Sequence, residues 1–101
     1  MYGTRKEAAD GCRYEASAAK RFSEAALKKA AAGECKAAWE LADTARTAAR
    51  CAAQAHEALW ALTNDELTDE EFAAFEAAEI AQADATKAER AAAAAVEKLN
   101  A

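Results

Sequence analysis

Three cysteines and the only histidine are the residues of this chain that could bind a metal: Cys12, Cys35, Cys51 and His56. Together they have the ligand types of a Cys3His zinc site. Zinc sites in small domains use close pairs such as Cys-x2–4-Cys, and the spacing here contains none. We therefore expect no metal, and we expect the cysteines to be small buried hydrophobes. A Cys12–Cys51 disulfide is the lesser alternative, because a chain folded at residues 32–33 brings these two to similar heights.

His56 could act as a general base only if another group oriented it. Its neighbours three and four positions away on a helix are all apolar, and Trp60 is one of them. Glu57 is adjacent in sequence and therefore points about 100° away from His56 on a helix. We expect a partly buried histidine beside Trp60 rather than a catalytic one.

The sequence also lacks other catalytic and metal-binding motifs. A carboxylate-bridged di-iron site needs Glu-x-x-His, but Ala53 stands three residues before His56. The acidic run NDELTDEEF lacks the Asp-x-Asp-x-Asp-Gly loop of a calcium site. The chain also has no glycine-rich phosphate loop, no Gly-x-Ser-x-Gly and no paired catalytic carboxylates. We expect neither an enzyme nor a bound cofactor.

The elements that would position these residues are helices. The chain has 35 alanines, three glycines and no proline among 101 residues, a composition that strongly favours helix. Gly33 follows KKAAA as a helix end, and Thr68 with Glu71 forms a capping-box pattern. We predict helices near residues 5–31, 35–62 and 69–99, with Gly11 delaying or fraying the first. Short connections make consecutive helices antiparallel, which predicts one all-α domain: an up-down-up three-helix bundle.

Alanines repeat at alternating steps of three and four in each predicted helix, as in a coiled-coil seam. Such a seam allows the helix axes to approach closely but buries little area per residue. The few large apolar residues crowd the second junction, from Leu59 to Ile80, so we expect that end to be better packed. The seam predicted for the second helix comprises Ala38, Leu41, Ala45, Ala48, Ala52, Ala55, Leu59 and Leu62. The seam predicted for the third helix comprises Ala74, Ala78, Ala81, Ala85, Ala88, Ala92, Ala95 and Leu99.

Charge is distributed unevenly along the chain. Residues 1–36 carry eight Lys or Arg and five Asp or Glu, whereas residues 63–101 carry three and ten. Mutual attraction inside the bundle explains this asymmetry, and a bipolar surface that orients a partner is the alternative. No uncharged run approaches the ~20 residues of a membrane span, and no signal peptide is visible. We expect a cytoplasmic protein that contacts no membrane.

A core built from alanine leaves apolar surface for a partner or a second copy of the chain. On a helical wheel Trp39 lies about 130° from the seam of its helix, beside Arg46 and Arg50. We therefore predict a protein–protein interaction module with these three residues as the contact surface, because tryptophan is enriched at interface hot spots. Trp39 could instead cover the Gly33 end of the bundle.

A basic strip on the first helix suggests a different function. It could contact phosphates and make the protein a regulator associated with nucleic acid. The overall charge of −5 opposes this, so nucleic-acid binding remains the alternative. The strip comprises Lys6, Arg13, Lys20, Arg21 and Lys28.

In length and helical composition the chain resembles the secreted WXG-type helical hairpins. The turn after Trp60 reads WALTN, without the glycine that should follow two residues after the tryptophan. The tail VEKLNA also lacks a Tyr-x-x-x-Asp/Glu signal. The resemblance therefore ends at length and composition, and the sequence assigns the chain to no family.

Overall fold

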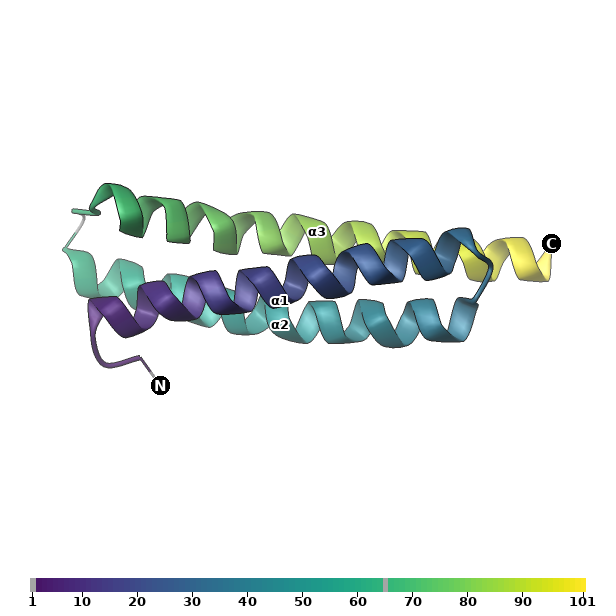
Figure 1. Cartoon of the computed structure of the whole chain (residues 1–101), viewed down its shortest axis with the longest axis horizontal. Helices are drawn as coiled ribbons and strands as arrows, with labels where there is room; N and C mark the ends of the chain where they lie inside the picture. The colour runs from purple at the N-terminus through teal and green to yellow at the C-terminus, as the bar shows by residue number, and fades with distance from the viewer. Residues whose placement is uncertain (1, 65) are drawn as a thin grey trace.

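Three antiparallel helices make up most of the computed structural model, which describes residues 2–64 and 66–101 (Figure 1). They are α1 (Arg5–Ala31), α2 (Cys35–Thr63) and α3 (Asp69–Asn100). Each helix packs against the other two in an elongated bundle of 52 × 21 × 15 Å. The predicted all-α, up-down-up bundle is confirmed. The two bounds that differ, the ends of α2 and α3, each lie one residue beyond the prediction.

Local side-chain chemistry explains where the helices begin and end. The Thr4 hydroxyl accepts a hydrogen bond from the Glu7 N–H at 3.1 Å, which caps α1. Thr68 and Glu71 form the predicted capping box at the start of α3. Gly33 has a φ of 77°, in the left-handed region that ends helices and favours glycine. These signals act within a few residues of each helix end, so the sequence reveals them.

Gly11 does not disturb α1, contrary to the prediction. The helix begins at Arg5 and continues through Gly11 without interruption. The ring of Tyr2 lies against this glycine, and a Cβ built there would overlap the ring. The missing side chain therefore makes room for the N-terminal segment to pack on α1.

The core is built almost entirely from alanine. Among the described residues, the largest fully buried side chains are those of Leu59, Thr63 and Cys12. The seam predicted for α3 is buried from Ala74 to Ala95, whereas Leu99, its last member, is 72% exposed. Small side chains allow the helix axes to come close together, which leaves little room between them for anything larger.

The large apolar residues lie mostly outside this core, so the expectation of a better-packed end holds only in part. Leu59 is buried, and Phe75 packs against the core cluster. Trp60, Phe72 and Ile80 are 48%, 51% and 58% exposed. The physical reason is the alanine seam: between closely approaching helices, a large side chain fits mainly along the flanks.

Candidate protein-binding surface

A group of two exposed and two half-buried rings lies on α2 and α3 near the end of the bundle that holds their connecting loop. We call His56, Trp60, Phe72 and Phe75 the aromatic patch. The rings of His56 and Phe75 stack with centroids 3.5 Å apart and planes 25° apart. Trp60 meets Phe75 at 5.9 Å in a tilted arrangement. Phe72 precedes Phe75 by three residues, so the two share one side of α3. The patch thus joins two helices into one apolar surface.

His56 has a carboxylate neighbour that the sequence did not indicate. Its Nε2 lies 3.4 Å from Oε1 of Glu79, which belongs to α3. Helical spacing reveals only the neighbours on the same helix, whereas both contacts of His56, Phe75 and Glu79, come from the other. The Glu79 side chain is 61% exposed, so the pair lies at the open surface and positions the imidazole against Phe75.

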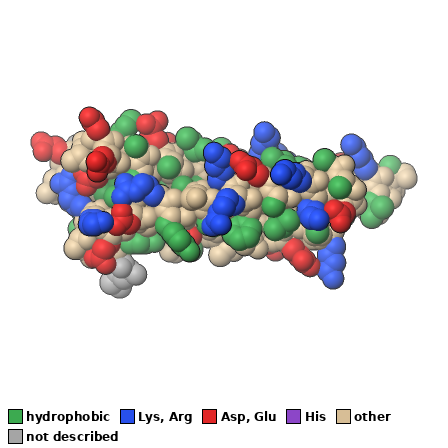
Figure 2. Space-filling view, in the orientation of Figure 1, with side chains coloured by type: hydrophobic (Ala, Val, Ile, Leu, Met, Phe, Trp, Pro, Cys, Tyr) green, Lys and Arg blue, Asp and Glu red, His purple; other side chains and the backbone are tan. Residues whose placement is uncertain are grey.

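Acidic residues surround the aromatic patch. From Cys51 to Thr86 the sequence holds nine of its 18 Asp and Glu residues and no Lys or Arg. Helical spacings of three or four place acidic side chains beside Trp60, Phe72 and Phe75. In Figure 2, which shows the face that carries α1, red side chains lie at the end of the molecule that holds the α2–α3 loop, together with blue Lys and Arg side chains. We call these four residues the acidic rim: Glu57, Asp69, Glu76 and Glu79.

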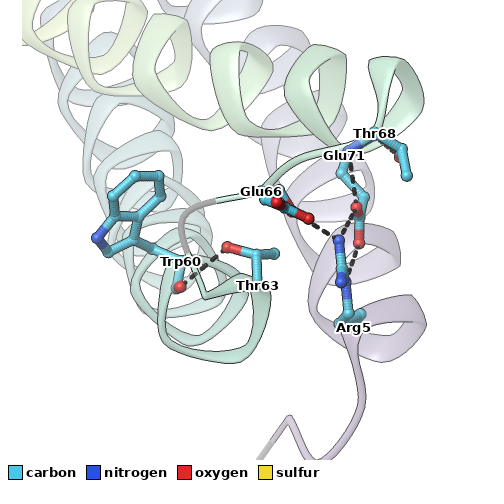
Figure 3. A network of polar contacts seen from close by, with 6 residues as sticks. All are labelled: Arg5, Trp60, Thr63, Glu66, Thr68 and Glu71. Atoms are coloured by element: carbon cyan, nitrogen blue, oxygen red, sulfur yellow. Dashed lines mark hydrogen bonds and ion pairs between the residues drawn. The ribbon is translucent and has the colours of Figure 1, made fainter.

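One arginine fastens the end of the bundle beside the patch. Arg5, the first residue of α1, donates from Nε to Glu71 Oε2 at 2.8 Å and from its terminal nitrogen to Glu71 Oε1 at 2.5 Å (Figure 3). The same nitrogen donates to the backbone carbonyl of Glu66 at 2.8 Å. Hydrogen bonds from Arg5, and then from the Thr68 N–H, lower the pKa of Glu71 to about 2. Figure 3 shows Trp60 on the other side of the loop from this cluster.

The Arg5–Glu71 contact predicts a stability that depends on pH. The pKa of Glu71 is lowered to about 2 from 4.5. Its contribution to stability is therefore present above pH 4.5 and is lost as the pH falls toward 2. We expect Glu71→Gln to lower the urea midpoint at neutral pH and to match the unsubstituted protein near the folded-state pKa. Glutamine can still accept from the Thr68 N–H, so the difference reports the charge.

Glu70→Gln is the matched control, because Glu70 lies in the same first turn of α3 and is exposed. Its midpoint should follow that of the unsubstituted protein across the pH range. If Glu71→Gln lowers the urea midpoint by the same amount at neutral pH and near the folded-state pKa, the Arg5 contact adds no charge-dependent stability.

The surface predicted around Trp39 is divided in the structure. Trp39 is 39% exposed, and Arg50 is exposed. Arg46 instead contacts α3, where it donates from Nε to the Glu89 carboxylate and from a terminal nitrogen to the Thr86 hydroxyl at 2.9 Å. Arg46 therefore joins two helices of the bundle. Of the predicted contact surface, only Trp39 and Arg50 remain exposed to a partner.

The basic strip of α1 is also only partly available. Lys6 and Arg13 both pair with Asp10 on the same helix. The other three members are exposed and have no ion-pair partner within the described part of the chain: Lys20, Arg21 and Lys28.

The potential metal ligands form no disulfide and no metal-binding cluster in the described part of the chain. The three cysteines are free thiols; Cys12 is buried, and burial raises its pKa. Within residues 2–64 and 66–101, no group of three or more His, Cys, Asp or Glu side chains could hold a metal ion.

None of the helices described has the length and hydropathy that crossing a bilayer requires. Comparisons of the chain with protein-family models, curated proteins and solved structures found no match.

Proposed function

We propose that this protein is a non-enzymatic protein-interaction module and that the aromatic patch is its contact surface. The observation that carries the proposal is the exposure of Trp60 and Phe72, at 48% and 51%, within one group of rings. Aromatic residues are enriched at protein interfaces, and a contiguous exposed apolar surface marks an interaction site more often than scattered residues do.

The scaffold supports this proposal because it holds the rings in place before any partner binds. Trp60 and Phe75 lie on two different helices and touch each other, so each restricts the other. The Arg5 contact with Glu71 fastens the nearby helix ends together. A partner that meets an ordered surface loses less conformational entropy on binding, which leaves more of the contact energy as affinity.

Trp60 alone can make a substantial contribution to the free energy of binding. A tryptophan side chain buries 150–250 Å2 when it is fully enclosed, so roughly 100 Å2 of Trp60 remains for a partner. At ~25 cal/mol per Å2, covering that area contributes about 2.5 kcal/mol. This exceeds what an exposed ion pair on the same surface contributes, which is about 0–1 kcal/mol.

Trp60→Ala is expected to weaken binding of the native partner about thirtyfold, because removing a central aromatic contact costs about 2 kcal/mol. The measurement is affinity capture from the native host with quantitative mass spectrometry, followed by titration of the captured protein. Helicity measured by circular dichroism should stay unchanged, since Trp60 is half-exposed.

Trp39→Ala is the matched control, because it removes the other α2 tryptophan, which lies about 30 Å away along the helix at 1.5 Å per residue. It should leave capture intact. If Trp39→Ala abolishes capture and Trp60→Ala does not, the contact surface is the one predicted at the Gly33 end. Salt-sensitive DNA retention that is lost on charge reversal at Lys20 and Arg21 would instead favour the nucleic-acid alternative.

A further inference from the structure

We infer that the partner segment that covers the aromatic patch is cationic: it places Lys or Arg side chains on the ring faces and against the acidic rim. This inference rests on the proposed function, because it names the chemistry of the partner for the same surface. Three features of the molecule support it: the charge around the rings, the lack of intramolecular partners for that charge, and the electrostatics of the rings themselves.

The Asp, Glu, Lys and Arg side chains that α2 and α3 themselves carry around the patch are all acidic. Between Arg50 and Lys87 the sequence contains no Lys or Arg, and the only ring there that can become positive is His56. Arg5 of α1 contacts the start of α3, and both of its donor groups already bind Glu71 or the Glu66 carbonyl. The patch is therefore apolar at its centre and negative at its edge.

The acidic rim is also free of intramolecular pairing over most of its length. Glu57, Asp69 and Glu76 are exposed and make no ion pair with any residue that the structure describes. Glu79 has His56 as its neighbour, at 3.4 Å. Glu57, Asp69 and Glu76 can thus accept hydrogen bonds from a partner without first breaking an ion pair in the bundle. Glu89, which lies farther from the α2–α3 loop, differs from them because its carboxylate already pairs with Arg46.

The exposed rings favour the same sign of partner. The face of an aromatic ring carries partial negative charge, so a guanidinium or ammonium group above Trp60 or Phe72 is attracted to it. The aliphatic stems of Lys and Arg also cover apolar surface while their charged ends reach the surrounding carboxylates. A cationic segment is therefore attracted both to the ring faces and to the acidic rim, whereas an anionic segment is repelled by both.

A peptide-display selection tests this inference without a purified partner. The probe is a library of short random peptides of unbiased composition, selected on the full-length protein. Counter-selection against Trp60→Ala removes peptides that bind elsewhere. We expect the surviving peptides to carry net positive charge, with Lys or Arg interspersed among apolar residues.

One surviving peptide is then titrated against variants of the full chain. Combined replacement Glu76→Gln and Glu79→Gln should weaken its binding about fivefold at low salt, because each exposed charge pair contributes modestly. Raising the salt concentration should reduce this difference by screening. Glu97→Gln, an exposed acidic position at the other end of α3, is the matched control and should leave the affinity unchanged.

The outcomes separate the inference from the function on which it rests. If the selected peptides are neutral or acidic, the inference of a cationic partner is wrong, while the aromatic patch remains the contact surface. An unchanged affinity for the Glu76→Gln and Glu79→Gln protein would do the same. If no peptide depends on Trp60, the proposed contact surface itself is wrong.

Discussion

Leu59→Ala is expected to lower the free energy of unfolding by about 3 kcal/mol, within the range measured for buried leucines in protein cores. Leu59 is completely buried, and it is the largest fully buried side chain in the described part of the protein. Its removal leaves a cavity that neighbouring alanines cannot fill, since an alanine has no rotamers with which to extend. The measurement is urea denaturation followed by helical circular dichroism.

The effect should be large relative to the total, because a domain of this size has a stability of about 5–15 kcal/mol. Leu99→Ala is the matched control: it removes the same atoms from a side chain that is 72% exposed and should change stability by less than about 0.5 kcal/mol. Similar losses for the two substitutions would show that Leu59 does not stabilise the core as its burial indicates.

Ala85→Leu should be as damaging as the loss of Leu59, although it adds apolar surface. Ala85 is completely buried in α3, where the helices meet through small side chains. An added isobutyl group has no space and must push the helices apart, so we expect a loss of about 3 kcal/mol, at the upper end for overpacked cores. The urea midpoint and the helicity of the variant measure this outcome.

Ala83→Leu provides the matched control two residues away on the same helix. Ala83 is exposed, and leucine and alanine are both good helix formers, so the change should be within about 0.5 kcal/mol. If Ala85→Leu stabilises the protein, the space around Ala85 accommodates a leucine side chain, and the helices do not pack as closely there as we infer.

The location of the aromatic patch could be foreseen only in part. Trp39 was the tryptophan most clearly displaced from the predicted seam, so the sequence drew attention to it. Trp60 and Phe72 lie among many large apolar residues at a helix junction, where such residues usually indicate core. The absence of Lys and Arg from Cys51 to Thr86 was the visible signal. It becomes informative only once the rings are known to be exposed.

Sequence alone determined the helices and their arrangement, because the forces responsible act over a few residues. Alanine propensity, the Thr68–Glu71 capping box and the left-handed Gly33 define the helix ends, and the short connections make neighbours antiparallel. The alternation of three and four along α3 correctly identified its buried alanines from Ala74 to Ala95. These features do not depend on which helix faces which.

Only the tertiary structure decided which side chains meet between helices. Arg5 with Glu71 and His56 with Phe75 are separated by 66 and 19 residues in the sequence and lie on different helices. Such contacts depend on how far each helix is rotated about its own axis and shifted along it. A seam of nearly identical alanines specifies that rotation and shift weakly, since one small side chain packs much like the next. The aromatic patch and its acidic rim therefore became visible only when the three helices were seen together.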